Sequence, residues 1–123
     1  PHPVINLMED QKDITKKGGT MRLGAWDCEI SEDSNVFKAY NKTMISERHR
    51  HRYEFNNSYS DQIFDEYFVI SGTNPETGLI EIIEYKNHPW FVGVQFHPEY
   101  KSTVSKPHPL FLAFVKASLA KKE

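Results

Sequence analysis

A near-continuous apolar run at residues 90–96 constrains the fold of this chain more than any other segment. Such a run is typical of a strand that is covered on both faces, and it is far too short to span a membrane. It ends directly in His97, Pro98 and Glu99. Because the proline fixes its own φ and disfavours helix at His97, the strand is followed at once by a histidine and a carboxylate. In α/β folds, catalytic groups commonly lie at the carboxyl ends of strands.

Hydrophobic patterns predict that the rest of the chain supplies more strands than helices. Together with the buried strand, a packed terminal helix indicates a mixed α/β layer. Alternation predicts strands at 20–25 (continuing to Cys28 and Ile30), 43–55, 68–71 and 79–85. Helical spacing predicts a helix at 36–40, capped by Asp33 or Ser34, and another at 56–67, capped by Ser58. A third helix is predicted from Pro109 onward. Its apolar face consists of Leu110, Phe111, Phe114, Val115 and Leu119. The charged residues 9–19 are predicted to form a long surface loop, a type that is often functional.

The composition fits one globular domain of 123 residues and excludes several functional classes. Hydrophobic residues make up 38% and charged residues 26% of the chain, so it can bury a core and is not a disordered segment. The formal net charge of −2 gives no basis for bulk binding to nucleic acid or to an anionic membrane. The single cysteine cannot form an internal disulfide, which indicates a reducing, cytoplasmic setting. The start at Pro1 lacks the features of a signal peptide, and we expect the chain to belong to a longer polypeptide.

The spacing of His97 and Glu99 suits a general base and the carboxylate that orients it. A histidine that accepts a proton needs a partner that fixes its tautomer and supports the imidazolium. Glu99 can reach back to the ring if Pro98 holds the turn open. The same spacing also fits an ordinary surface hydrogen bond, so both interpretations stay open at this point.

A basic run at residues 47–54, Glu-Arg-His-Arg-His-Arg-Tyr-Glu, allows several interpretations. Its two histidines resemble a metal-binding pair, but the three interleaved arginines would repel a cation, and we expect no metal site. Nucleic-acid binding is not supported, because the sequence contains no further stripe of basic residues. Recognition of an anion is possible chemically, because the planar arginine side chain pairs with a carboxylate in a bidentate manner. Alternatively, the arginines pair with Glu47, Glu54 and other acids of the fold, as we expect of at least one of them.

The same run has a predicted direction for each side chain. If residues 43–55 form a strand, the three arginines (Arg48, Arg50 and Arg52) point to one side, and the two histidines (His49 and His51) point to the other.

Two further features are explained most simply by structure alone. Residues 18–24, Gly-Gly-Thr-Met-Arg-Leu-Gly, lack the spacing of a phosphate-binding or dinucleotide-binding loop, and a tight entry into a strand accounts for the glycines. Cys28 lies within a predicted strand between Asp27 and Glu29, whose charges would raise the pKa of its thiol. A catalytic cysteine usually occupies a sharp strand-to-helix turn among small residues. We therefore interpret Cys28 as a structural residue and not as a nucleophile.

Taken together and in order, the segments 18–24, 47–54 and 87–102 resemble the C-terminal part of the glutamine amidotransferase domain of the CTP synthase family. The His97-Pro98-Glu99 element is shared by the wider class I glutamine amidotransferases, and the other two segments narrow the resemblance to CTP synthases. This resemblance extends over nearly the whole chain of residues 1–123. The resemblance implies the α/β, flavodoxin-like fold of class I amidotransferases, here incomplete, with a mixed sheet flanked by helices.

The resemblance also implies roles for individual residues. Family members hydrolyse glutamine through a cysteine that attacks the side-chain amide and forms a glutamyl thioester. By this similarity His97 takes the thiol proton and later protonates the leaving ammonia, and Glu99 orients His97. Arg52 would hold the α-carboxylate of glutamine, with help from the Tyr53 backbone. The family's nucleophile and oxyanion hole lie in an upstream glycine-rich segment that this chain does not contain, so the chain alone is expected to be inactive.

Further partners follow from the resemblance alone. CTP synthases aminate UTP to CTP with ATP and with ammonia from glutamine. The ATP, Mg²⁺ and UTP sites belong to an upstream synthase domain, through which we also expect a homo-oligomer, a tetramer. GTP activates family members at the junction of the two domains, and the loop at 9–17 is a candidate for part of that site.

Two other interpretations stay open beside this one. The chain could come from a different class I amidotransferase, for example one that feeds GMP synthesis, but the basic run and residues 18–24 count against it. It could also be a non-catalytic regulatory module that keeps only the fold. The presence of His97, Glu99 and Arg52 counts against that interpretation, since a decayed site need not keep them.

Overall fold

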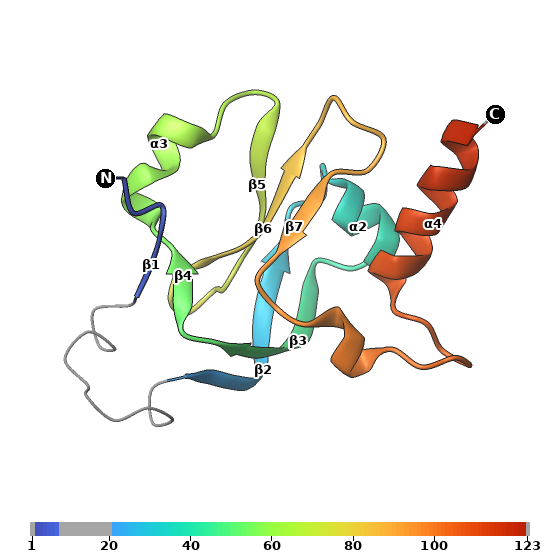
Figure 1. Cartoon of the computed structure of the whole chain (residues 1–123), viewed down its shortest axis with the longest axis horizontal. Helices are drawn as coiled ribbons and strands as arrows, with labels where there is room; N and C mark the ends of the chain where they lie inside the picture. Colours follow the sequence, from blue (N-terminus) through green and yellow to red (C-terminus); the bar gives the residue numbers. More distant parts are fainter. Residues whose placement is uncertain (1, 8–20, 123) are drawn as a thin grey trace.

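A computed structural model of the chain describes residues 2–7 and 21–122 (Figure 1). Its main feature is a five-stranded sheet in the order β3-β2-β5-β6-β7. The strands of this sheet are β2 (Arg22–Ile30), β3 (Met44–His51), β5 (Phe68–Thr73), β6 (Ile80–Tyr85) and β7 (Val92–Val94). A separate pairing joins β1 (Ile5–Leu7) to β4 (Tyr53–Phe55). The helices are α2 (Asn35–Tyr40), α3 (Ser60–Ile63) and α4 (Pro109–Lys122), with 3-10 turns η1 (Asn57–Tyr59) and η2 (Pro98–Lys101).

The core joins the sheet to α2 and to the first turn of α4. Its buried members are Cys28, Ile30, Val36, Ile45, Ile82, Phe96 and Leu110. Each large apolar side chain buried in this way contributes about 1.5–3 kcal/mol to the stability of the fold. The expected α/β class is thereby confirmed. Within the described residues every pair of strands is antiparallel. Antiparallel pairing was expected for some of the strands. The parallel pairing that the family resemblance implies for most of the sheet is not found in this part of the chain.

β3 follows the predicted alternation but ends at His51, and residues 53–55 of the predicted strand form β4. In β2 the predicted alternation of 20–25 is reversed, since Arg22 is buried and Leu23 is 54% exposed. β2 and β3 pair antiparallel, with Arg22 opposite His51 at one end and Glu29 opposite Met44 at the other. Within β2, Gly24 has a φ of 80°, a conformation that side chains with a Cβ rarely adopt, which explains the glycine at this position. Residues 18–20 of the glycine-containing segment lie outside the described residues, as does the predicted loop at 9–19.

Helix α2 is confirmed, with the predicted cap. The hydroxyl of Ser34 accepts a hydrogen bond from the backbone N–H of Phe37 at 2.9 Å, and Ser34 itself is extended. The helix ends at Asn41, which has a φ of 58° and is the only non-glycine residue with positive φ in the described part of the chain.

The helix predicted over 56–67 is much shorter in the structure. Asn56, and not Ser58, caps the first turn, and α3 ends at Ile63. Phe64 is extended, and its ring lies between those of Phe55 and Phe68, with ring centroids 5.3 and 5.2 Å apart. The Asp65 side chain then accepts two backbone hydrogen bonds, which turn the chain into β5. Tertiary packing of one aromatic ring has therefore overridden the helical spacing.

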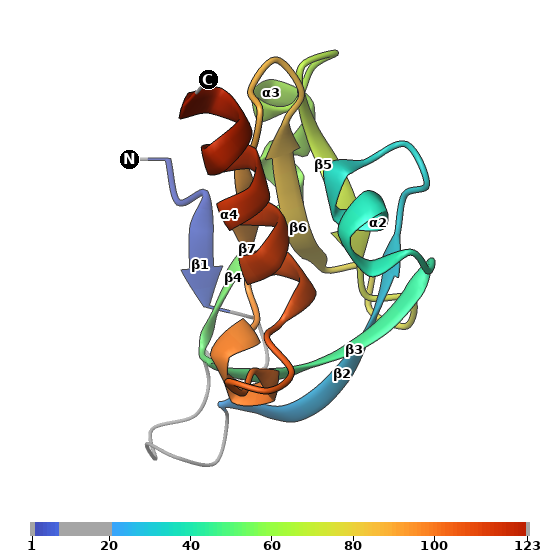
Figure 2. The same cartoon turned by 90° about the vertical axis from the view of Figure 1, so that its right-hand side faces the viewer.

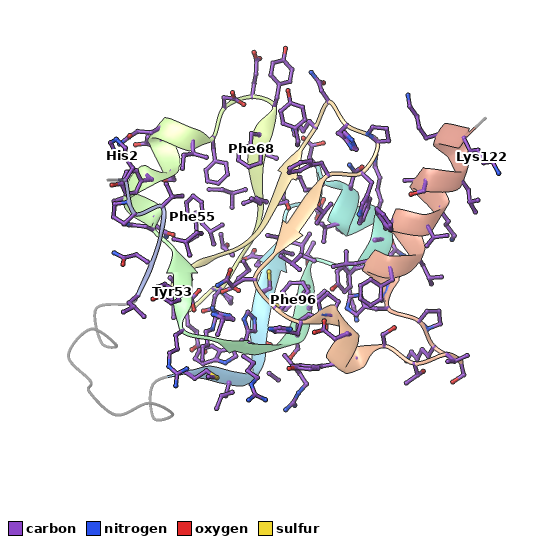
Figure 3. All side chains as sticks on the ribbon, in the orientation of Figure 1. His2, Tyr53, Phe55, Phe68, Phe96 and Lys122 are labelled. Carbon is purple, nitrogen blue, oxygen red and sulfur yellow. The ribbon has the colours of Figure 1, made fainter. Side chains whose placement is uncertain are left out.

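The apolar run at 90–96 forms a shorter and less buried strand than predicted. Only residues 92–94 form a strand, β7, and all three are half-buried. β7 is the last strand of the sheet and pairs only with β6, so no other described strand covers its outer edge. Because its three residues are only half-buried, the prediction of a strand covered on both faces is wrong for the described residues. Phe96, beyond the strand, is the buried residue of the run, with 3% exposed (Figure 3).

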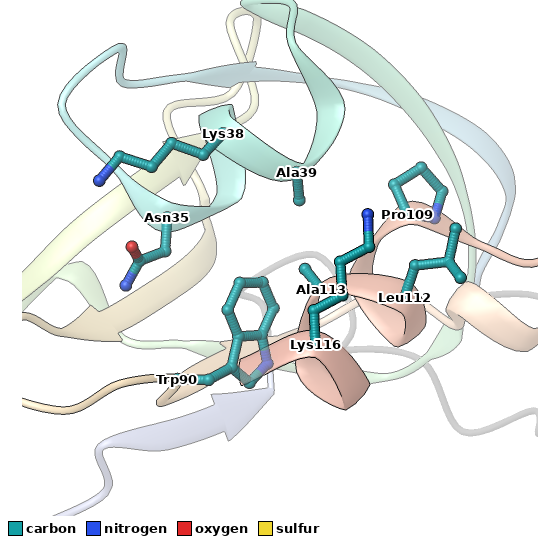
Figure 4. Close-up of a pocket in the computed structure, with 8 residues that line it drawn as sticks. All are labelled: Asn35, Lys38, Ala39, Trp90, Pro109, Leu112, Ala113 and Lys116. Atoms are coloured by element: carbon teal, nitrogen blue, oxygen red, sulfur yellow. The ribbon is translucent and has the colours of Figure 1, made fainter. Parts of the chain in front are cut away.

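Helix α4 begins at Pro109 as predicted, but its apolar residues do not pack as expected. Only Leu110 is buried, whereas Phe111, Phe114, Val115 and Leu119 are each at least 42% exposed. In Figure 1, α4 lies at the margin of the described fold next to α2, and Figure 2 views the molecule from that side. A cavity of about 360 Å³ lies between the two helices, with Trp90 at one end and Lys38 and Lys116 at its rim (Figure 4).

The exposed side of α4 makes residues 1–123 prone to self-association when they are produced as a separate polypeptide. Exposed apolar patches of this kind promote aggregation. We expect the wild-type segment to elute in light-scattering chromatography as large assemblies. Phe114→Glu together with Leu119→Lys should raise the monomer fraction, whereas the control pair Lys116→Glu and Ser118→Lys, on the same helix, should not. A monomeric wild-type segment with one cooperative thermal transition would contradict this expectation.

Candidate active site

His97 and Glu99 form a hydrogen-bonded pair directly after the last strand of the sheet. Nδ1 of His97 lies 2.7 Å from Oε1 of Glu99. His97 is in extended conformation, and Pro98 then begins the turn η2 that brings Glu99 back to the ring, as the sequence predicted. The hydrogen bond from His97 lowers the pKa of the Glu99 carboxyl, which therefore stays ionised at neutral pH. An ionised acceptor at Nδ1 fixes the imidazole tautomer and leaves Nε2 as the site that can accept a proton.

The position of the His97 ring is fixed by its neighbours. Its backbone N–H donates to the carbonyl of Arg48 at 2.9 Å, which ties the segment to the middle of β3. The ring stacks on Tyr100, with centroids 5.0 Å apart and an angle of 18° between the planes. Its side chain is 36% exposed, so a reacting group can reach it. Lys101 at the end of η2 donates to the carbonyl of Ser46 at 2.6 Å, which gives the turn a second attachment to β3.

The basic run lies on β3, β4 and the corner between them. The predicted alternation is confirmed, since His49 is 2% exposed whereas Arg48 and Arg50 are exposed. Arg52 lies at the corner and is half-buried, and Tyr53 begins β4. We call Arg52 and Tyr53 the clamp segment. Figure 3 shows Tyr53 and Phe96 on neighbouring segments of the chain, at the same end of the sheet.

The acids at the two ends of the basic run do not pair with its arginines. Glu47 is 1% exposed and accepts hydrogen bonds from the hydroxyl of Tyr40, at 2.7 Å, and from Nε2 of His108. Glu54 is 3% exposed and pairs with Arg22 at 3.2 Å. Within the described residues no arginine of the run forms an ion pair with these two acids or with another acid, so our expectation that at least one would do so is wrong there. Both acids face inward, Glu47 on β3 and Glu54 on β4, whereas Arg48 and Arg50 face outward on β3.

A buried polar cluster underlies the clamp segment. Arg22 lies 2.7 Å from Glu81 and also contacts Glu54 and the ring of Trp26. Burial raises the pKa of Glu81 to about 7, against the opposing charge of Arg22. Burial, together with the same arginine, lowers the pKa of His49 to about 3 and that of His51 to about 4. Both histidines are therefore neutral at pH 7 and serve as hydrogen-bonding groups, not as cations.

One contact to the clamp segment was not foreseen from the sequence. The side chain of Gln95, two residues before His97, reaches the carbonyl of Tyr53 and the ring of His51. The sequence shows a glutamine beside a histidine motif, but nothing in its spacing indicates a contact 42 residues away.

Cys28 lies in the core, away from solvent. It is 1% exposed, and Gly72 on β5 leaves room for its sulfur, since a Cβ at Gly72 would lie 2.8 Å from Sγ. Burial, together with the charge of Glu81, raises the pKa of the thiol to about 12. A neutral, enclosed thiol is a poor nucleophile, which supports a structural role.

The described residues, 2–7 and 21–122, show neither a metal-ligand cluster nor a membrane-spanning helix. Within these ranges no group of three or more histidine, cysteine or acidic side chains is arranged to hold a metal ion. No helix in the same ranges has the length and hydropathy needed to cross a membrane.

Comparisons with known proteins support the family resemblance. A family model for class I glutamine amidotransferases matches residues 3–117. A CTP synthase of Christiangramia forsetii is 66% identical over 117 residues, which are 95% of this chain and 21% of that protein. A CTP synthase of Flavobacterium johnsoniae is 60% identical over 119 residues, 97% of this chain and 22% of that protein. The chain thus spans about a fifth of the length of these curated relatives.

A solved structure agrees with these matches. The glutaminase domain of a CTP synthase from Trypanosoma brucei, determined with bound acivicin, superposes with a TM-score of 0.84 at 35% identity. The match covers 97% of this chain and 47% of that domain structure. The chain therefore has the fold of roughly half of a glutaminase domain.

The raised pKa of Cys28 predicts an unreactive thiol in the folded protein. For this test the segment would replace the matching residues of the Christiangramia forsetii relative, a hybrid that we call the chimera. At pH 8, well below a pKa of about 12, Cys28 is protonated and should resist iodoacetamide, as followed by peptide mass spectrometry. A control cysteine at the exposed position of Ser105 should react at the rate of a free thiol. Equal rates in the folded chimera would contradict the buried placement of Cys28.

Proposed function

This chain belongs to the class I glutamine amidotransferase family, and we propose that it forms the base-bearing part of a CTP synthase amidotransferase domain. In that role it helps to hydrolyse glutamine to glutamate and ammonia. The observation that carries the proposal is the hydrogen-bonded pair of His97 and Glu99 at the strand end, where the His97 backbone is bonded to Arg48 on β3. A second half of the domain, outside this chain, would supply the nucleophilic cysteine and the oxyanion hole.

His97 acts as the general base of the proposed reaction. Its Nε2 takes the proton of the cysteine thiol as the sulfur attacks the side-chain amide of glutamine. It then gives this proton to the nitrogen that leaves as ammonia, and a thioester is formed. Water, deprotonated by the same ring, next attacks the thioester, and the thiol and glutamate are released. Glu99 accepts a hydrogen bond from Nδ1 throughout and stabilises the imidazolium that forms in each step.

Arg52 and Tyr53 bind the α-carboxylate of glutamine. In the described part of the chain, no hydrogen bond or ion pair occupies the side chain of Arg52, so its guanidinium is available to a carboxylate there. An arginine can hold a carboxylate through two parallel hydrogen bonds, and a backbone N–H of Tyr53 would add a third. The clamp segment thereby sets the position of the substrate amide relative to His97.

The remaining activity belongs to the whole polypeptide. Ammonia from the glutaminase site would be used for the ATP-dependent amination of UTP to CTP in a synthase domain. ATP and Mg²⁺ bind to that domain in this proposal, and GTP acts as an activator. The protein is cytoplasmic and forms a homo-oligomer, a tetramer, through the synthase domain. The other partners in the proposal are small molecules, with neither nucleic acid nor membrane among them.

His97→Ala in the chimera tests the base. Loss of a general base typically lowers the rate about 10²- to 10⁴-fold. We expect glutamine-driven CTP formation to fall by this factor, whereas formation driven by added ammonium chloride should persist because it bypasses the glutaminase site. His88→Ala, at an exposed histidine outside the site, should leave both rates unchanged. Glutamine-driven turnover equal to that of the unmodified chimera would show that His97 is not the base.

Arg52→Ala tests the carboxylate clamp. Hydrogen bonds to charged groups contribute about 1.5–3 kcal/mol, so the KM for glutamine should rise about tenfold to hundredfold, with a smaller change in kcat. The matched variant Arg50→Ala, at an exposed arginine on β3, should keep the original KM. The role of Arg52 is rejected if steady-state kinetics show the same glutamine dependence for both variants.

A further inference from the structure

We propose that Gln95 is a positioning residue that holds the clamp segment in register with His97. This role rests on the proposed function, because it concerns the geometry of the same glutaminase site. Gln95 lies two residues before His97, and its side chain ends on the carbonyl of Tyr53. It therefore connects the segment that carries the base to the segment that is proposed to bind the substrate.

The contacts of Gln95 fix it at both ends. Its backbone N–H donates to the carbonyl of Glu81 on β6 at 2.9 Å, which continues the pairing of β7 with the sheet. Its Nε2 donates to the Tyr53 carbonyl at 2.5 Å and lies 3.2 Å from Nδ1 of His51. The carboxamide nitrogen is a donor, and the Tyr53 carbonyl is its acceptor. A change in this side chain would thus be felt at Tyr53 while the backbone of Gln95 stays attached to the sheet.

The buried cluster lies next to these contacts. Nδ1 of His51 lies 3.1 Å from the Tyr53 carbonyl and 3.2 Å from Nε2 of Gln95, and of these two groups the carbonyl is the acceptor. Nε2 of His51 lies 2.7 Å from Nδ1 of His49, whose Nε2 faces Oε2 of Glu81 at 3.5 Å. Burial lowers the pKa of both histidines, so each ring is neutral at pH 7 and donates through one nitrogen only. The side chain of Gln95 therefore ends on the same carbonyl that the cluster contacts through His51.

The two attachments of the site to β3 and β4 explain why this contact matters for catalysis. The His97 backbone is bonded to Arg48, near the middle of β3, and the Gln95 side chain is bonded to Tyr53, just after the corner that holds Arg52. The first contact places the base, and the second places the clamp relative to it. A small displacement of a bound substrate can lower the efficiency of a reaction strongly.

Two variants of the chimera test the proposal. Gln95→Leu removes both donors, and Gln95→Glu keeps the size of the side chain but turns acceptor oxygens toward the Tyr53 carbonyl and His51. We expect each to raise the KM for glutamine about tenfold, in line with the loss of one or two hydrogen bonds. The kcat of the glutamine reaction should change less than the KM, and CTP formation from ammonium chloride should be unchanged. Gln62→Leu and Gln62→Glu, at an exposed glutamine on α3, are the matched controls and should behave like the unmodified chimera.

The possible results separate this inference from the function on which it rests. If the unmodified chimera consumes glutamine and His97→Ala does not, but both Gln95 variants keep the original KM, the positioning role is overturned and the glutaminase function stands. An equal loss of glutamine-driven and ammonia-driven synthesis in both Gln95 variants would also overturn it, because the residue would then be needed for the fold in general. If the unmodified chimera makes CTP from ammonia but not from glutamine, the proposed function fails first, and the positioning role fails with it.

Discussion

A buried carboxylate, that of Glu47, connects the elements on which the candidate site rests. An unpaired charge at 1% exposure would be strongly unfavourable, so the residue requires its partners. These come from three other parts of the chain: Tyr40 at the end of α2, His108 before α4, and Lys101, 3.8 Å away, at the end of η2. Since η2 also carries Glu99, the network around Glu47 helps to hold the pair of His97 and Glu99 in place.

His108 shows how such a network also determines local structure. Its Nδ1 accepts the backbone N–H of Leu110, and so it caps the first turn of α4. With Nδ1 as an acceptor, a neutral ring carries its proton on Nε2, which is the atom that faces Glu47. One side chain therefore begins a helix and satisfies a buried charge on β3, 61 residues away.

Strand β3 is polar on the face that a sheet normally buries with apolar side chains. Glu47, His49 and His51 all face inward, in line after Ile45. They divide between two networks: Glu47 belongs to the one beneath η2, and the two histidines belong to the one beneath the clamp segment. This division gives a single strand two rigid attachments to the site, one for the base and one for the proposed substrate clamp. Polar networks in a core stabilise a unique arrangement only when each member is satisfied.

The sequence predicted features that depend on neighbours along the chain. The alternation of β3 was predictable because successive side chains of a strand face opposite sides, and Ser34 was predictable as a cap because a cap bonds within its own turn. The same holds for the contact between His97 and Glu99, which are separated by a single proline and meet within one turn.

Tertiary structure decided what depends on residues far apart in the chain. The early end of α3 follows from the packing of Phe64 between Phe55 and Phe68, and the free face of α4 follows from its place at the margin of the described fold. The sequence could suggest Arg52 as a clamp only by family resemblance, and it gave no sign of the contact between Gln95 and Tyr53. Hydrophobic periodicity encodes which face a residue takes, but not which distant polar group it meets there. The partner depends on which distant residues the folded chain brings next to each buried polar side chain.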